Sequence, residues 1–347
     1  MQQQRKTPKK DPVILTHQKD HVLLHNLSNL SMTTTRIYQS SSSNISNLII
    51  NFKESRIVDN ITKKEIQCYL MEPDIGGEDP DIVIFVQSRP LARSARDLIR
   101  NTWANGSYYN DDVTGKPFVL FVCGLDPSCN CVCDNLTAEI LTNRDILLVN
   151  IQDTYDNLTL KGLLTMHWIL KRFGGSLKYV IKTDDDVMLN TFRWLSILRS
   201  SSFNNTSSFI LGHVWQRSKV KREGKYRVSK EQYPEEYYPP FCAGPGYAMS
   251  RDAMTVLLKM TSKVRYLNRE DVFITGLLAA AGRISRYSFS KDSYKLYSFK
   301  MKNNIRWEST MLVHGTDIIT RRNVWRKYVT NYRLKVNSLF KIFFTAS

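Results

Sequence analysis

The sequence predicts an α/β fold in which a mostly parallel sheet is flanked by helices. Apolar runs with the length of buried strands alternate along the chain with segments of helical periodicity, which is typical of parallel sheets. The expected strands are Ile82–Val86, Phe118–Val122, Ile146–Val149 and Tyr179–Ile181, and the expected helices are Ser94–Trp103, Thr137–Thr142 and Leu158–Phe173. The last helix is the clearest, because its apolar residues recur every three or four positions and two glycines follow it. With 347 residues, 42% of them hydrophobic, the chain can bury one large core or two smaller ones.

The two ends of the chain differ in pattern from its middle. Residues 1–60 lack periodicity and contain runs of Ser and Thr, which is typical of a flexible lead. We therefore expect a stem or disordered lead over residues 1–65, one folded domain over residues 66–335 and a short tail over residues 336–347. Residues 1–50 contain no signal-peptide core, and no apolar run approaches the roughly 18 residues of a membrane helix.

The chain is strongly basic. It has 49 Lys and Arg against 32 Asp and Glu, which gives a formal net charge of +17. Such a charge suits nucleic acid, an anionic membrane surface or an acidic substrate. No zinc-finger spacing or RNP-like motif accompanies it, and the basic residues are spread out, with clusters at Arg217–Lys225 and Arg321–Lys327. A basic surface that faces anionic substrates or membranes is therefore favoured over a nucleic-acid groove.

Nine Asn-X-Ser/Thr triplets indicate the secretory pathway, because the composition predicts roughly three or four by chance. They begin at Asn26, Asn29, Asn44, Asn60, Asn105, Asn135, Asn157, Asn204 and Asn205. Six cysteines permit disulfides there, but the pairing is open, since Cys129, Cys131 and Cys133 are too close together for all three to be bridged to one another. Because no entry signal is visible, we expect the true N-terminus, with its anchor, to lie outside this sequence. The alternative is a cytosolic protein with coincidental triplets.

The strongest candidate for a functional site is the acidic triplet Asp184, Asp185 and Asp186, which directly follows the expected strand Tyr179–Ile181. Three adjacent carboxylates repel one another unless a cation lies among them. Oxygen ligands of this kind suit Mg²⁺ or Mn²⁺, which often bridge to nucleotide phosphates, and the carboxyl ends of strands are where open α/β sheets bind ligands. The alternative is a solvated acidic turn before a helix that begins near Asn190.

Two further segments carry candidate binding residues. Arg93, Arg96 and Arg100 share one face of the first expected helix, where guanidinium groups could hold a diphosphate; the alternative is a solvated basic stripe. The segment Tyr237–Tyr247 is rich in glycine, proline and aromatic residues, so its backbone could approach a ligand closely and its rings could stack on a sugar or base. An ordinary loop is the alternative for this segment.

Other candidates have equally ordinary alternatives. Glu270 and Asp271 precede an apolar helix expected at Val272–Ala281, where acidic residues also occur for helix-dipole reasons alone. Asp156 or Asn157 is expected to cap the long helix that follows them. His314 follows an apolar pair, and a lone histidine in such a place is more often structural than a ligand.

Taken in order, these segments resemble the β-1,3-glycosyltransferase (galactosyltransferase) family, whose members are inverting, metal-dependent enzymes with the Rossmann-like GT-A fold. The resemblance covers about residues 80–330. The matching motifs are Arg96 with Ile99, Arg100, Thr102 and Trp103; Asp153 with Tyr155, Asn157, Leu158, Thr159 and Lys161; Lys182–Val187; Tyr238–Tyr247; Glu270–Val272; and Val313 with His314. Each motif is weak alone, but their shared order is specific.

The resemblance implies a role for each matched residue. Asp184, Asp186 and His314 look like the ligands of Mn²⁺ or Mg²⁺, and Asp271, with Glu270 beside it, looks like the general base. The donor-side residues would be Arg96, Arg100, Lys182, Asp184 and Asp185. The acceptor-side residues would be Tyr238, Phe241, Gly244, Gly246 and Tyr247. The partners would be a UDP-sugar and a glycan on a glycoprotein or glycolipid, with no nucleic acid, and the domain would face the Golgi lumen from a membrane anchor.

The expected reaction is therefore the transfer of galactose or an N-acetylhexosamine from UDP to the 3-hydroxyl of a glycan. Some positions depart from the family. Phe173 or Gly174 stands where many relatives have a cysteine, so Cys242 is expected to lack a partner; Pro245 lies between the loop glycines; and Trp215–Tyr226 is unusually basic. A metal-dependent phosphate-transfer or hydrolysis enzyme is an alternative, although no P-loop supports it. A degenerate member that acts as a glycan-binding or chaperone scaffold is another, although the intact aspartates argue against it.

Overall fold

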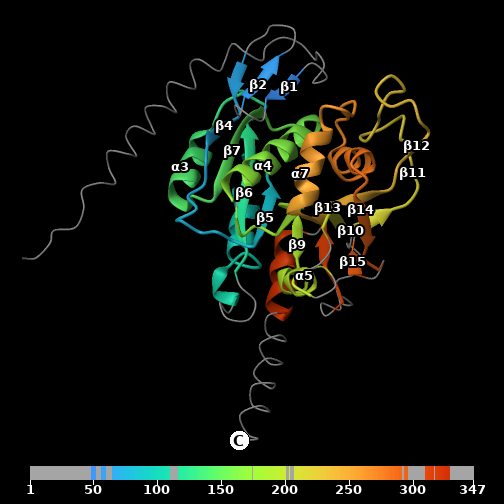
Figure 1. Cartoon of the computed structure of the whole chain (residues 1–347). Coiled ribbons are helices and arrows are strands. Elements are labelled where there is room, and N and C mark those ends of the chain that lie inside the picture. Colours follow the sequence, from blue (N-terminus) through green and yellow to red (C-terminus); the bar gives the residue numbers. More distant parts are fainter. Residues whose placement is uncertain are drawn as a thin grey trace, which may run out of the picture.

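A computed structural model describes residues 48–51, 56–59, 65–109, 116–173, 175–200, 203, 207–290, 293–295, 309–315 and 317–328. Its centre is an eight-stranded sheet with the order β14-β10-β13-β8-β5-β6-β7-β4 (Figure 1). The strands are β4 (Tyr69–Met71), β5 (Ile82–Gln87), β6 (Phe118–Leu125), β7 (Ile146–Gln152), β8 (Tyr179–Asp184), β10 (Phe209–Trp215), β13 (Phe241–Ser250) and β14 (Ser285–Ser288). The four central strands β8, β5, β6 and β7 are all parallel, while β13 and β4 pair antiparallel with their neighbours. The expected α/β class is therefore confirmed.

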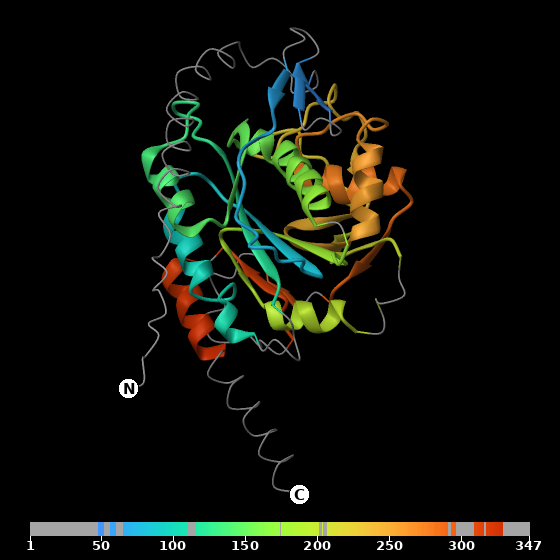
Figure 2. The same cartoon turned by 60° about the vertical axis from the view of Figure 1, so that its left-hand side comes forward.

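Helices cover both faces of this sheet (Figure 2). They are α2 (Arg93–Arg100), α3 (Asp134–Asn143), α4 (Leu158–Arg172), α5 (Thr191–Leu198), α7 (Arg251–Met260), the π-helix η4 (Val272–Leu278), α8 (Ala279–Ala281), a helix over residues 318–328, and the 3₁₀ turns η2 (Gly106–Tyr108) and η3 (Tyr155–Asn157). Strand β5 shows why two layers form, because its side chains alternate between the faces. Val83 and Phe85 join a core with α4 and α7, whereas Ile84 joins a second core with α2, α3 and α5.

Three small sheets accompany the central one. The strands β1 (Leu48–Asn51), β2 (Arg56–Asp59) and β3 (Glu65–Gln67) form an antiparallel sheet at the end of the molecule opposite α5 (Figure 1). Strands β1 and β2 lie inside the segment expected to be a stem or disordered lead, so the expected lack of structure does not hold for them, and β3 begins at the last residue of that segment. Residues 1–47 and 329–347 lie outside the described residues, as do six of the expected sequons, at Asn26, Asn29, Asn44, Asn60, Asn204 and Asn205.

The other two small sheets lie nearer to the acidic triplet. Strands β11 (Ser218–Lys219) and β12 (Tyr237–Tyr238) pair with each other. Strands β15 (Tyr294–Lys295), β16 (Leu312–His314) and β9 (Val187–Leu189) form a three-stranded sheet, and β9 begins directly after the triplet. This last sheet brings the C-terminal part of the chain against the end of β8.

The expected strands and helices are all present, with different ends. Helix α2 stops at Arg100 rather than at Trp103, because Asn101 and Thr102 bond through their side chains to the carbonyl oxygens of Asp97 and Leu98 in its last turn. The expected cap of α4 is wrong: the side chain of Asn157 donates back to Gln152 and that of Asp156 accepts from Asn268, so neither caps the helix. In the part of the chain that the structure describes, no helix has the length and apolarity needed to cross a membrane.

Candidate active site

The acidic triplet lies at the carboxyl edge of the central sheet, as its sequence position predicted. Asp184 ends β8 and pairs in register with Gln87 at the end of β5. The three carboxylates avoid mutual repulsion because each has its own partner. Asp184 accepts from the Lys182 ammonium at 2.7 Å, and Asp185 accepts from the Ser88 hydroxyl at 2.9 Å.

Asp186 lies beside His314. Strand β16 pairs antiparallel with β9 so that His314 stands opposite Val187, and His314 Nε2 lies 3.2 Å from Asp186 Oδ2. Burial would raise the pKa of Asp186, but the hydrogen bond and charge of His314 outweigh burial and hold this pKa below its usual range. Asp186 Oδ1 is shielded from solvent and has no hydrogen-bond partner among the described residues. This oxygen is the one unsatisfied acceptor of the triplet.

The residues around Asp186 can be compared with the ligands that a divalent cation needs. In the described part of the chain, no group of three or more His, Cys, Asp or Glu side chains is arranged to hold a metal ion. The pair of Asp186 and His314, with its unsatisfied oxygen, nevertheless offers two ligands. Mg²⁺ and similar ions are commonly held by one or two protein groups together with substrate phosphates. The two residues therefore fit a cation that a nucleotide diphosphate helps to hold, while Asp184 faces Lys182 instead.

Lys182 connects the triplet to a second carboxylate pair. Its buried ammonium donates to Asp184 Oδ1 and to the Gly244 carbonyl, both at 2.7 Å, and lies 3.5 Å from Glu270 Oε2. Burial alone would lower the pKa of Lys182, yet the charges of Asp184 and Glu270 outweigh it and raise this pKa. Burial, aided by the nearby charge of Asp271, raises the pKa of Glu270 to about 7. The hydroxyl of Tyr247 donates to Glu270, which fixes its orientation.

Asp271 is half-buried at the start of the π-helix η4. Its Oδ1 accepts from the Val272 amide at 2.9 Å and its Oδ2 accepts from the Gly244 amide at 3.2 Å. Burial raises the pKa of Asp271, although these amides and the charge of Lys182 oppose the shift. A side chain at position 244 would meet Asp271 Oδ2 at 3.3 Å, so glycine there allows the close approach. Asp271 is held firmly and keeps an exposed part.

The aromatic residues expected to contact an acceptor lie mostly inside the protein. Tyr247 has no exposed surface, and Tyr238 and Phe241 are buried in the core beside α4. A side chain at position 246 would clash with Leu312, so Gly246 permits packing between the sheets rather than access for a ligand. The segment therefore packs against Asp271 and Glu270 from inside the protein. Direct contacts between its aromatic residues and an acceptor remain a prediction.

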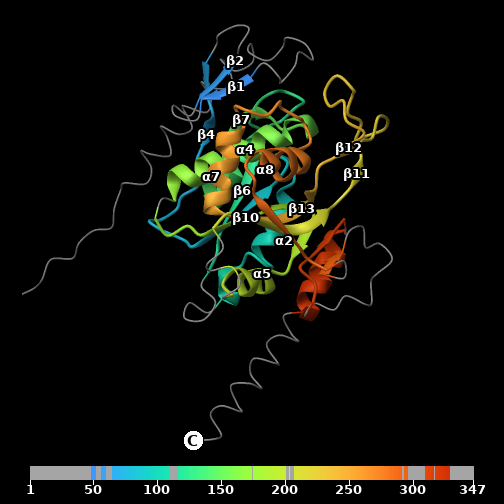
Figure 3. The ribbon, with the colours of Figure 1, turned by 45° about the vertical axis from the view of Figure 1, so that its right-hand side comes forward.

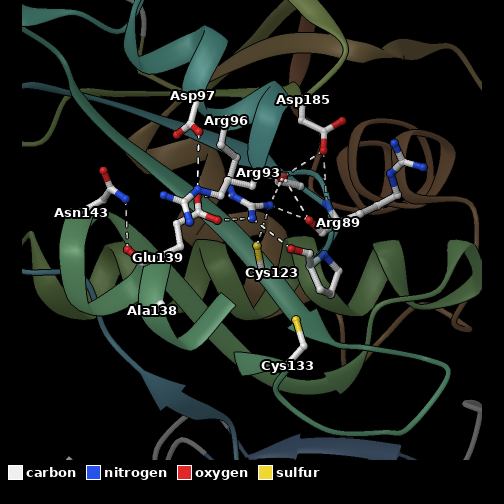
Figure 4. Close-up of polar contacts among 12 residues, drawn as sticks. Arg89, Arg93, Arg96, Asp97, Cys123, Cys133, Ala138, Glu139, Asn143 and Asp185 are labelled. Atoms are coloured by element: carbon white, nitrogen blue, oxygen red, sulfur yellow. Dashed lines mark hydrogen bonds and ion pairs between the residues drawn. The ribbon is translucent and has the colours of Figure 1, made fainter. Parts of the chain in front are cut away.

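Arg96 has no exposed surface, and its guanidinium is fully used within the protein (Figure 4). It makes a two-pronged ion pair with Glu139, at 2.8 and 2.6 Å, and donates to the Ser88 hydroxyl and to the carbonyls of Arg89 and Pro90. Direct contact with a diphosphate would require breaking these bonds. The structure thus places Arg96 as a support for the loop between β5 and α2, which differs from the expected donor contact.

Arg100 is held in a similar way. It forms ion pairs with Asp145, Glu139 and Asp97, at 2.8, 2.8 and 2.7 Å. Of the expected basic stripe, only Arg93 is largely exposed, and its guanidinium lies 3.6 Å from the Asp97 carboxylate. The stripe is therefore neither a solvated surface nor an open phosphate site.

Several functional neighbours were not singled out from the sequence. The Lys161 ammonium, buried against Asp153 at 2.8 Å, donates to the Ser88 carbonyl at 2.9 Å. Together with Arg96 it clamps the loop whose Ser88 hydroxyl orients Asp185. Arg321, from one of the basic clusters, donates to the Asp185 carbonyl. Lys161 and Asp153 belong to one of the family motifs, and this motif is the sequence signal that points to them. No rule of residue spacing predicts that they contact each other and Ser88.

The cysteines follow the expectation in part. Cys129 and Cys131 form a disulfide, which resolves one of the open pairings. Cys242 is a buried free thiol, and burial raises its pKa to about 12, so the expected lack of a partner is confirmed.

A parallel-centred sheet with a carboxylate triplet at its carboxyl edge, next to a half-buried carboxylate at a helix start, places the candidate site where α/β enzymes bind their ligands. The comparison with known families agrees. The family model for Galactosyltransferase matches residues 94–290, and the chain belongs to this family. Its class is that of a hexosyltransferase.

Characterised relatives are similar over most of the domain. Mouse beta-1,3-galactosyltransferase 5 is 33% identical over 224 residues, which are 63% of this chain and 70% of the relative. Human beta-1,3-galactosyltransferase 1 is 29% identical over 263 residues, 74% of this chain and 76% of the relative. Human UDP-GalNAc:beta-1,3-N-acetylgalactosaminyltransferase 1 is 32% identical over 200 residues, 57% of this chain and 59% of the relative. A solved glycosyltransferase involved in glycosylating the major capsid of PBCV-1 aligns with 71% of this chain and 99% of that chain at a TM-score of 0.38 and 11% identity, too distant for a detailed comparison.

Proposed function

We propose that the protein is an inverting, metal-dependent β-1,3-hexosyltransferase that moves galactose or an N-acetylhexosamine from a UDP-sugar to the 3-hydroxyl of a glycan. One observation carries this proposal. The Lys182 ammonium joins the triplet to the base segment through Asp184 and the Gly244 carbonyl, so a donor-side group and an acceptor-side group share one buried cation. The names of the relatives support the donor class and the linkage.

The donor would lie at the carboxyl edge of β8. Asp186 and His314 would hold Mn²⁺ or Mg²⁺, and Asp184 and Asp185 would position the sugar nucleotide beside them. When bound, the cation neutralises the negative charge that grows on the leaving diphosphate. Lys182 holds Asp184 in place, because its ammonium is buried and hydrogen-bonded both to Asp184 and to the Gly244 carbonyl.

Asp271 would take the proton from the acceptor hydroxyl. Inversion needs a carboxylate on the face of the sugar opposite the leaving group, and half-buried Asp271 is the more accessible member of the second carboxylate pair. Its raised pKa makes it a stronger base than an ordinary aspartate. Glu270 is buried and bonded to Tyr247, so it would orient the segment rather than accept the proton.

We further propose that the domain works in the Golgi lumen, held at the membrane by a segment outside this sequence. The nine sequons support a secretory route. Asn135 is exposed in the first turn of α3, where an oligosaccharide can be attached without unfolding.

Calorimetry with UDP, with and without Mn²⁺, tests the donor side. UDP should bind more tightly with Mn²⁺ in the wild type, and Asp186→Ala should remove this dependence. Asp252→Ala, which changes an exposed aspartate in the first turn of α7, is the matched control and should behave as the wild type. Unchanged UDP affinity and metal response in Asp186→Ala would disprove the assignment of Asp186. A hydrolysis screen over UDP-sugars then identifies the sugar.

A further inference from the structure

Two exposed tyrosines form a platform beside the second carboxylate pair. Tyr155 and Tyr226 keep 42% and 38% of their surfaces exposed, and their ring centroids lie 5.9 Å apart. The Lys225 ammonium lies 5.6 Å from the first ring and 5.5 Å from the second, and the Lys221 ammonium lies 5.6 Å from the ring of Tyr226. These four residues are called the tyrosine platform below. Aromatic rings and cations together are a surface that suits a sugar carrying an acid group.

The basic residues of the cluster Arg217–Lys225, to which these lysines belong, have different contacts. Arg222 holds the projecting loop between β11 and β12 together, because it donates to five backbone carbonyls within it (Figure 3). Lys219 pairs with Glu236 at 3.1 Å, and Arg217 stacks on Tyr237 at 4.1 Å. Lys221 and Lys225 are both exposed, and their described contacts are with the platform rings, not with carboxylates. Both ammonium groups therefore lie over the rings, without an ion pair to a described carboxylate.

The platform is tied to the base segment. Arg269, which directly precedes Glu270 and Asp271, is buried with its guanidinium 5.2 Å from the ring of Tyr155. The same guanidinium donates to the Arg227 carbonyl at 2.7 Å, next to Tyr226 in the chain. One buried side chain thus fixes both tyrosines relative to the residue that would deprotonate the acceptor. A glycan whose acceptor hydroxyl faces Asp271 would thus place another of its sugars on the platform.

We propose that the tyrosine platform binds an acidic sugar of the acceptor, so that the enzyme prefers acceptors bearing a sulfate or carboxylate group over their neutral counterparts. The rings would contact the apolar face of the sugar, and Lys221 and Lys225 would pair with the acid. This inference rests on the proposed function, since it concerns the acceptor of that reaction.

The test uses matched glycans that differ only in the acid group. A glycan array with neutral, sulfated and sialylated or uronate-containing forms of the same β-galactosides is probed with the full chain in the presence of UDP and Mn²⁺. Members that bind are then assayed as acceptors. The acidic forms should bind about five- to tenfold more tightly than the neutral ones, as expected for two solvent-exposed charge pairs, and this preference should vanish at high salt. The sulfated and carboxylated arms show which acid is preferred.

Variants separate the two parts of the platform. The double variant Lys221→Gln/Lys225→Gln should lose the preference for acidic glycans and keep UDP binding and donor hydrolysis. Lys219→Gln removes a neighbouring lysine already paired with Glu236 and should keep the preference. Tyr226→Ala should weaken binding of neutral and acidic forms alike.

Equal use of neutral and acidic glycans by the wild type, or a preference that survives in the double variant, would overturn the inference. Failure of the proposed function would look different. The wild type would then neither bind UDP nor hydrolyse any UDP-sugar, while array binding would still report on the platform by itself.

Discussion

Glu270→Gln should change how the stability of the protein depends on pH. Burial, with the charge of Asp271 nearby, raises the pKa of Glu270 from 4.5 to about 7. Between these values the folded state holds a proton that the unfolded chain releases, so the free energy of unfolding falls as pH rises through this window. One pKa unit corresponds to about 1.4 kcal/mol, so ionised Glu270 costs about 3 kcal/mol above neutral pH that it does not cost in mild acid.

Urea unfolding of the wild type and of Glu270→Gln, at about pH 4.5 and about pH 8, measures this contribution. Between the two pH values, the variant should gain about 3 kcal/mol relative to the wild type. Glu139→Gln is a control of opposite sign. Burial would raise the pKa of Glu139, but Arg96 and Arg100 outweigh burial and lower it. Glu139 therefore contributes stability that is present above its ordinary pKa and is lost in acid, so its variant should be penalised more at neutral pH.

The reasoning would be refuted if the difference between Glu270→Gln and the wild type were the same at both pH values. Glu270 would then ionise as an exposed glutamate does, and Lys182 would neutralise it completely. A shift of the opposite sign would mean that the attraction of Lys182 exceeds the cost of burial. Neither result would change the choice of Asp271 as the base, because Glu270 is set aside for its burial and its bond to Tyr247.

Three other outcomes are expected. Asp271→Asn should keep UDP binding and lose about 10²-fold or more of turnover, measured with saturating donor; near-normal turnover would place the base elsewhere. Arg96→Met should lower the free energy of urea unfolding by about 2–3 kcal/mol, because it removes the two-pronged partner of buried Glu139 and leaves it with the ion pair to Arg100, whereas exposed Arg93→Met should change it by at most about 0.5 kcal/mol. In secretory cells, mass analysis should show that Asn135→Gln removes a glycan, while Asn157→Gln leaves the mass unchanged, because the Asn157 amide is bonded to the Gln152 carbonyl.

The sequence predicted the sheet and the place of the triplet well, because apolar periodicity reports directly on burial. Strand Tyr179–Ile181 and helix Leu158–Phe173 are both present, with small changes at their ends. The pairing of Asp186 with His314 is different in kind. It depends on two three-residue strands, β9 and β16, whose register no periodicity reveals. Only the motif order pointed to it.

The basic stripe shows the limit of spacing rules. Intervals of three and four residues place Arg93, Arg96 and Arg100 near one another on a helix, but they do not tell which part of that face packs inward. The decisive residue is Glu139, a buried acid on the separate helix α3. Because Glu139 pairs with Arg96 inside the protein, Arg96 stabilises the fold from within. Likewise, glycines and aromatics in Tyr237–Tyr247 predicted an open binding loop, whereas most of the segment is the central strand β13.

The π-helix η4 bears on how this chain can evolve. Each of its hydrogen-bonded turns holds one more residue than a turn of α-helix, so deleting a single residue would let the segment continue as an α-helix with its ladder of bonds intact. The same deletion would rotate the residues before it by about 100° relative to those after it. Asp271, at the start of the segment, would then turn away from the Gly244 amide. A one-codon loss in Val272–Leu278 would thus move the proposed base while leaving the hydrogen-bond ladder of the helix continuous.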